Sequence, residues 1–201
     1  EELATPEAFQ RDPKLVWDWY AWRRGLVLQA QPNAGHFALV ELESWVPEFL
    51  LVTQNVDGLH GRAGSKEIVE LHGNIARTKC YDCERVADEL DPVSDTVPPR
   101  CVHCGGMLRP DVVWFGEMLP AHALERAVQA ATACNVLLSV GTSTVVEPAA
   151  SLPFSALRAG AGVVEVNPDP TPLTGRASFS LRGPAGVVLP ALVASAFRER
   201  G

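Results

Sequence analysis

The sequence has 201 residues, of which 47% are hydrophobic and 20% charged, and a formal net charge of −7. This length suits one globular domain, or one domain with a small insertion. We find no apolar run near the roughly 20 residues of a membrane span, and the negative charge argues against nucleic acid, whose phosphates require clustered lysines and arginines. We therefore expect neither a membrane nor a nucleic acid as direct partner.

The first residues, 1–6, are acidic and polar and show none of the features of a signal peptide. The sequence therefore predicts a cytoplasmic protein. Its five cysteines include two Cys-x-x-Cys pairs, which in a cytoplasmic protein indicate metal thiolates more than disulfides.

The first half of the chain predicts two helices and a strand. A helix is expected from Pro13, because Asp12 is a good N-cap and proline is favoured at the first helical position. Pro32 breaks this helix, and a second helix is predicted over residues 34–43. The apolar run at residues 49–52 ends in polar residues, which is typical of a buried parallel strand.

The alternation of helix and strand continues in the second half. Helices are predicted at residues 120–133, 153–158 and 184–198, strands at 136–140 and 162–166, and a proline-rich loop at 91–99. Right-handed βαβ units with this pattern form a doubly wound, Rossmann-like parallel sheet of the α/β class, with its ligand crevice at the carboxyl ends of the strands.

Residues 73–113 interrupt the alternation and predict an inserted zinc-ribbon module. Its ligands are Cys80, Cys83, Cys101 and Cys104. The spacing of the two pairs is that of four-cysteine structural zinc sites, which have no open position for water. A redox dithiol or unrelated thiols remain alternatives. His103 is interpreted as a surface residue and Cys134 as a small core hydrophobe.

Two short strings carry the most specific chemistry. Thr-Gln-Asn-Val-Asp-Gly-Leu-His occupies residues 53–60, after the first predicted strand, and Leu-His-Gly occupies residues 71–73. The amides and the carboxylate of the first string suit a ribose and a carboxamide, and the imidazole of the second suits general base chemistry.

Together these strings resemble the sirtuin family in their order along the chain. The resemblance also includes both cysteine pairs, Val-Trp-Phe-Gly-Glu at residues 113–117, Gly-Thr-Ser at 141–143 and Val-Asn at 166–167, and it covers residues 5–197. It implies an NAD-dependent protein-lysine deacylase that consumes NAD and binds one structural Zn²⁺. The acyl group moves from lysine to ADP-ribose, so the expected partners are acylated-lysine proteins or peptides.

The resemblance also implies the site residues. His72 is the expected general base. The cofactor-binding positions are Gln54, Asn55, Asp57, Gly141, Thr142, Ser143, Asn167, Pro168, Asp169 and Ala185. Residues 141–143 match a turn beside the cofactor, residues 167–169 match the segment at the adenosine ribose, and Ala185 matches a residue by the adenine. These last positions could instead be ordinary strand-end turns.

Two further sets are expected to bind the substrate. Val113, Phe115 and Gly116 match the strand on which sirtuins bind the peptide by β-augmentation, so affinity there comes mainly from main-chain hydrogen bonds. Tyr20 and Arg23 resemble the Tyr-x-x-Arg pair of sirtuins that remove succinyl and malonyl groups, since a guanidinium and a phenol can bind a distal carboxylate. A surface arginine on an amphipathic helix is the alternative.

Sirtuins begin with a strand and a glycine-rich phosphate turn, and the sequence lacks this segment. We therefore expect a fragment of a longer protein or a truncated homologue, with an N-terminally incomplete NAD-binding domain at residues 1–72 and 114–201 around the module at 73–113. Deacylation of succinyl, malonyl and acetyl lysine is the predicted function. The alternatives are a mono-ADP-ribosyltransferase and an inactive zinc-bearing module that binds acyl-lysine peptides.

Overall fold

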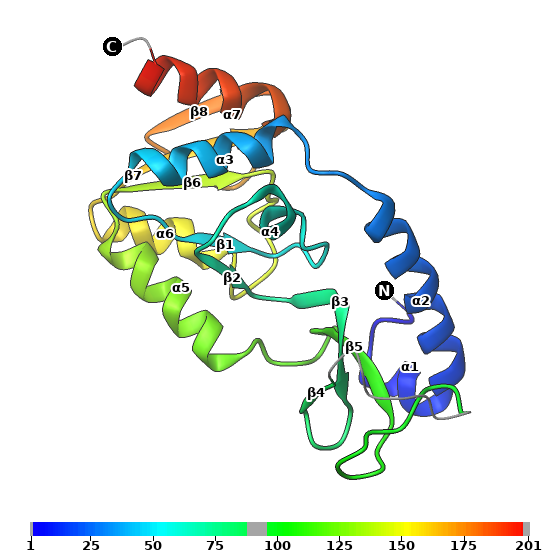
Figure 1. Ribbon diagram of the computed structural model, residues 1–201. Helices are drawn as coiled ribbons and strands as arrows, with labels where there is room; N and C mark the ends of the chain where they lie inside the picture. The colour runs from blue at the N-terminus through cyan, green and yellow to red at the C-terminus, as the bar shows by residue number, and fades with distance from the viewer. Residues whose placement is uncertain (1, 88–95, 199–201) are drawn as a thin grey trace. The chain divides into compact units, whose positions relative to one another are not determined.

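A computed structural model of the chain describes residues 2–87 and 96–198 (Figure 1). Part of the loop predicted at residues 91–99 therefore lies outside the described residues. The chain divides into two compact units. The first comprises Glu1–Gln31, Thr53–Gly58 and Glu70–Pro120, and the second comprises Pro32–Val52, Leu59–Val69 and Ala121–Gly201.

The second unit contains a parallel sheet with helices on both faces. Its strands are β6 (Val136–Val140), β7 (Gly162–Asn167) and β8 (Phe179–Arg182), in the order β6-β7-β8. The helices are α3 (Ala34–Trp45), α4 (Leu59–Ala63), α5 (Ala121–Ala133), α6 (Ser151–Arg158) and α7 (Ala185–Val193), which a π-helix, Ala194–Arg198, follows. This is the doubly wound arrangement that the alternation predicts.

Strand β7 shows how the two faces are covered. Val166 packs with residues of α3 and α7 in one cluster, while Val163 packs with Ala156 of α6 in another. Because successive side chains of a strand point to opposite faces, Glu165 points to the same side of the sheet as Val163. This strand therefore carries a carboxylate into the α6 side of the core, where Glu165 is 1% exposed.

The first unit combines two helices with an antiparallel sheet. The helices are α1 (Pro6–Arg11) and α2 (Pro13–Gln29), and the strands are β3 (Gly73–Cys80), β4 (Val86–Ala87) and β5 (Leu108–Val112), in the order β4-β3-β5. Phe9, Tyr20 and Trp114 are buried together in its core. A further two-stranded sheet pairs β1 (Leu51–Thr53) with β2 (Ile68–Glu70).

Local signals predicted several element ends well. Helix α2 begins at Pro13, and the carboxylate of Asp12 accepts the backbone N–H of Leu15 at 3.0 Å. Asn33 caps α3 in a capping box with His36. The helix predicted to reach residue 198 differs, because α7 ends at Val193 and continues as the π-helix.

Most of the elements that the sequence did not predict are short, and β3, with eight residues, is the exception. They include α1, α4, β2 and β8, none of which exceeds six residues. Segments of this length carry too few periodic positions to predict an element, so their structure depends on tertiary contacts. Among the described residues, no helix is both long and apolar enough to span a membrane.

Candidate active site and metal centre

The four cysteines of the two Cys-x-x-Cys pairs come together in the first unit. The Sγ atoms of Cys80, Cys83, Cys101 and Cys104 all lie within 4.8 Å of one another. Cys80 and Cys104 are 3.4 Å apart, and Cys83 and Cys101 are 3.8 Å apart. Four sulfurs at about 2.3 Å from a tetrahedral zinc lie about 3.8 Å from each other, so this donor set fits one Zn²⁺.

Backbone amides favour the thiolate at one of the four sulfurs, that of Cys101. The N–H groups of Cys104 and His103 point at the sulfur of Cys101 and lower its pKa to about 7, which favours the thiolate that binds metals. His103 itself is exposed and is not part of the cysteine cluster. Cys134 packs beside the α6 side of the sheet, as a small core residue would.

The predicted general base is held by the chain that follows β1. The ring Nδ1 of His72 lies 2.8 Å from the backbone carbonyl oxygen of Gln54. Because a carbonyl can only accept, Nδ1 carries the hydrogen and Nε2 is left as the basic nitrogen. The backbone oxygen of His72 accepts the N–H of Val113 at 2.9 Å, so the base adjoins the segment predicted to bind peptide.

Gly73 shows why a glycine follows this histidine. Its φ is +78°, and a Cβ built on it would lie 2.2 Å from the backbone oxygen of Asp111. Strand β3 begins at Gly73 and pairs it with Val112 of β5. The close approach of the two strands beside His72 therefore requires a residue without a side chain.

The neighbouring polar positions follow β1 in the same unit. Asn55 is exposed, whereas Gln54 and Asp57 are partly buried. The hydroxyl of Thr53 accepts the N–H of Asn55 at 3.0 Å and fixes the chain as it leaves the strand. The first unit thus brings His72 and this polar string together.

In the second unit, the predicted cofactor-binding residues 141–143 and 167–169 lie at the carboxyl ends of β6 and β7. Gly141 follows β6 with a φ of +61°, and its N–H donates to Val166 at 2.9 Å. The side-chain amide of Asn167 donates to the backbone oxygen of Thr142 at 2.8 Å, and its carbonyl accepts the N–H of Asp169. Asn167 therefore ties the two strand ends together.

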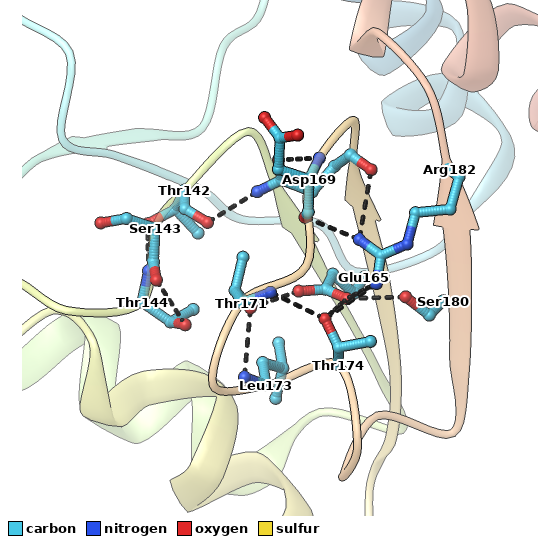
Figure 2. A network of polar contacts seen from close by, with 11 residues as sticks. Thr142, Ser143, Thr144, Glu165, Asp169, Thr171, Leu173, Thr174, Ser180 and Arg182 are labelled. Atoms are coloured by element: carbon cyan, nitrogen blue, oxygen red, sulfur yellow. Dashed lines mark hydrogen bonds and ion pairs between the residues drawn. The ribbon is translucent and has the colours of Figure 1, made fainter.

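A buried polar network supports this strand end (Figure 2). The carboxylate of Glu165 accepts hydrogen bonds from the hydroxyls of Thr171, Thr174 and Ser180 and lies 3.6 Å from the guanidinium of Arg182. Burial by itself would raise the pKa of Glu165, but these hydroxyls hold it below its ordinary value. Arg182 also donates to the backbone oxygen of Asp169 at 2.6 Å.

Sequence reasoning missed this network, although a signal for it exists. Glu165 interrupts an otherwise apolar strand, and a charge in a buried strand needs polar partners.

Ala185 begins α7, and a Cβ on Gly35 of α3 would lie 3.0 Å from the backbone oxygen of Ala185. A cavity of about 290 Å³ beside α6 is lined by Phe154, Leu157, Arg158 and Arg176 and includes none of the predicted site residues.

The pair predicted to bind the acyl group, Tyr20 and Arg23, lies on α2 in the first unit. Tyr20 is 5% exposed, and its hydroxyl oxygen lies 3.0 Å from Nε1 of Trp114. An indole nitrogen only donates, so the phenol accepts there and keeps its own hydrogen for an acceptor. The guanidinium of Arg23 lies 4.7 Å from the ring centre of Trp19.

The predicted peptide-binding segment differs from the expected strand. Strand β5 ends at Val112, and residues 113–117 form an extended stretch followed by a turn, which the N–H of Glu117 closes on the oxygen of Trp114 at 3.0 Å. The N–H of Trp114 donates to the carboxylate of Glu117 at 2.7 Å. The side chain of Glu117 therefore bonds the N–H of Trp114 within the segment, so this amide is not the one that pairs with a neighbouring strand.

The fold and these sites define a class of protein: a doubly wound α/β protein with a small antiparallel sheet that carries a four-cysteine metal site. The profile of the Sir2 family matches residues 1–148. The chain belongs to the Sir2 family.

Comparisons with individual proteins agree. The chain is 56% identical over 174 residues to the NAD-dependent protein deacylase of Aquifex aeolicus, covering 87% of this chain and 73% of that protein. It is 55% identical to NAD-dependent protein deacylase 2 of Pyrobaculum aerophilum, covering 96% and 77%. A Sir2 homologue solved as an NAD complex superposes with a TM-score of 0.93 at 46% identity, covering 100% and 78%. A Sir2 protein bound to acetylated peptide superposes with a TM-score of 0.88 at 31% identity, covering 97% and 83%.

Proposed function

We propose that this chain removes acyl groups from protein lysines in an NAD-dependent reaction, with His72 as its general base. Relatives at 55–56% identity are named NAD-dependent protein deacylases, and similar solved structures contain NAD or acetylated peptide. The observation that carries the assignment of the base is the contact between Nδ1 of His72 and the oxygen of Gln54, which leaves Nε2 to accept a proton. The hydrogen bond between the N–H of Val113 and the backbone oxygen of His72 supports the proposal that the substrate binds beside His72.

NAD supplies the reactive bond, between its ribose and nicotinamide, and the acyl-lysine oxygen replaces the nicotinamide. The chain's residues orient the reactants and move the proton. Gln54, Asn55 and Asp57 are proposed for the nicotinamide half, and His72 for the proton of a ribose hydroxyl. In the second unit, the turns at residues 141–143 and 167–169, with Ala185, are proposed for the adenosine half.

We further propose a preference for acidic acyl groups. Tyr20 keeps a hydrogen to donate, because its oxygen already accepts from Trp114, and Trp114 lies within the segment proposed to bind peptide. Arg23, one turn further along α2, supplies a guanidinium for a distal carboxylate. Acylated proteins of the cytoplasm are the proposed substrates, and residues 73–113 are proposed as an inserted module of the NAD-binding domain.

A product assay tests the proposed reaction. Incubation with NAD and a succinyl-lysine peptide should yield nicotinamide, the peptide with an unmodified lysine, and succinyl-ADP-ribose, as detected by mass spectrometry. His72→Ala should lower the rate by about 10²–10⁴, the usual contribution of a general base, whereas His122→Ala, which removes an exposed histidine of α5, should leave it unchanged. ADP-ribosylated protein without deacylated peptide would indicate a mono-ADP-ribosyltransferase. Peptide binding without any product would indicate an inactive binding module.

A further inference from the structure

Arg109 is a buried cation in the first unit with a specific set of partners. It lies in β5 and is 3% exposed. Its two terminal nitrogens face the two carboxylate oxygens of Glu117, one pair at 2.9 Å, and Nη2 also donates to the backbone oxygen of Val112 at 2.7 Å. A buried guanidinium needs such pairing, because its desolvation is costly.

The same guanidinium also contacts Trp114. Its carbon Cζ lies 3.2 Å from the ring centre of Trp114, a cation–π contact. Trp114 is itself 2% exposed and packs between Phe9 and Tyr20 in the aromatic core. The side chain at the centre of the predicted peptide-binding segment is therefore fixed by Arg109 as well as by the core.

Glu117 fixes the main chain of the same segment. Its carboxylate accepts the N–H of Trp114 at 2.7 Å, and its own N–H donates to the oxygen of Trp114 at 3.0 Å. The turn between them passes through Gly116, whose φ is +87°. Glu117 therefore closes this turn with both its side chain and its backbone.

The ends of the segment are held by other backbone groups. The N–H of Val113 donates to His72, and the N–H of Phe115 donates to Ala4, each at 2.9 Å. With Trp114 bonded to Glu117, consecutive amides of the segment have partners within the first unit. The segment thus has a defined conformation before any peptide binds, which lowers the entropy cost of binding.

Resting on the deacylase function proposed above, we propose that Arg109 and Glu117 are positioning residues for the substrate peptide. They hold residues 113–117 in one conformation. The N–H groups of Val113, Trp114 and Phe115 are already bonded, so the peptide backbone pairs with other main-chain groups of the segment. Neither side chain is proposed to contact the acyl group. Loss of the pair should therefore weaken binding of a peptide far more than binding of an isolated acyl-lysine, because only the peptide uses the main-chain contacts on both sides of the lysine.

The test compares two carboxylates of the same unit. Glu117→Gln removes the charge that Arg109 and Trp114 share, and Asp111→Asn removes a more exposed ion pair with Arg77. Affinity is measured by fluorescence anisotropy of a labelled succinyl-lysine peptide and by its competition with a doubly capped succinyl-lysine. We expect Glu117→Gln to weaken the peptide about 10-fold or more, as loss of a charged hydrogen bond does, and to change the capped amino acid less than about twofold. Asp111→Asn should change neither.

An equal loss for both ligands would overturn the inference, because it would mean a general structural role, and so would an unchanged peptide affinity. Should Glu117→Gln fail to fold, hydrogen exchange of the parent protein decides instead. We expect the amide of Trp114 to be protected without peptide, and protection that arises only after peptide addition would contradict the proposal. A parent protein that binds both ligands but forms no acyl-ADP-ribose would refute the deacylase function and leave the comparison of affinities valid.

Discussion

At the scale of single residues, a substitution of Arg23 can test the proposed acyl preference without disturbing the fold. It is partly exposed, and its guanidinium contacts the ring of Trp19. None of the ion pairs found among the described residues includes Arg23. Arg23→Met keeps much of the side-chain length and loses the charge. We expect kcat/KM for desuccinylation to fall by a factor that corresponds to on the order of 2–5 kcal/mol, because a charge pair with the substrate is broken. We expect kcat/KM for deacetylation to change little.

Steady-state kinetics with matched succinyl and acetyl peptides measures this difference. Lys14→Met is the control, because it removes an exposed cation from the same helix, where Lys14 pairs with Asp18 four residues away. Parallel losses on both peptides would identify Arg23 as a structural residue of α2.

Gly73 allows a second prediction at this scale, about stability. Gly73→Ala meets a left-handed φ and the oxygen of Asp111 at 2.2 Å, whereas Gly160→Ala, at a φ of +91°, meets no atom within 4 Å. A left-handed alanine costs about 1–2 kcal/mol, and we expect Gly73→Ala to cost about 1–3 kcal/mol more than Gly160→Ala because overpacking adds to it. Thermal unfolding monitored by circular dichroism compares them. Equal losses would mean that β3 and β5 separate without strain.

At the scale of elements, the zinc module depends on the pairing of β3 with β5. Cys80 ends β3 opposite Leu108, and the N–H of Tyr81 donates to Met107 at 2.9 Å. Metal binding and local folding are linked through the thiolates. We expect one zinc per chain by metal analysis, and we expect a strong chelator to speed hydrogen exchange at Tyr81 more than at Val113.

Two cysteine variants sharpen this prediction. Cys101→Ser removes a ligand and should abolish stoichiometric zinc, whereas Cys134→Ser lies outside the cluster and should retain it. Carefully reduced protein that contains no zinc would show that the four thiols serve another purpose.

At the scale of the whole molecule, a paired carboxylate in each unit predicts sensitivity to acid. Burial alone would raise the pKa of Glu117, but Arg109 and the N–H of Trp114 hold it below its ordinary value, and the pKa of Glu165 is likewise lowered. Such groups contribute stability above the unfolded glutamate pKa of about 4.3. This contribution is lost as the pH falls through the lower, folded pKa.

We therefore expect the destabilisation by Glu165→Gln to be largest near neutral pH and to shrink as the pH falls below about 4. Chemical denaturation at several pH values measures it, with metal content determined in the same samples because zinc also leaves in acid. Glu67→Gln, which removes an exposed pair with Arg126, should change stability by less than about 1 kcal/mol at any pH. A pH-independent effect of Glu165→Gln would indicate that its charge is not what stabilises β7.

The sequence by itself determined the features that depend on neighbours along the chain. The alternation of helix and strand gave the doubly wound sheet, Asp12 and Asn33 gave the starts of two helices, and the spacing of the cysteines gave the zinc ligands. Hydrophobic period, capping and ligand spacing are local, so they can be read without a fold. The Sir2 family followed from motifs in order, while the roles of individual site residues stay predictions.

Only the tertiary structure decided which distant groups meet. The short strands and helices had too few residues to signal themselves, and β8 is defined by its pairing with β7. The tautomer of His72 depends on Gln54, and the carboxylate of Glu165 is stabilised by a hydrogen bond from Ser180 and by the positive charge of Arg182. Hydrogen bonds between positions far apart in sequence leave no periodic pattern, because each requires the fold that brings its two partners together.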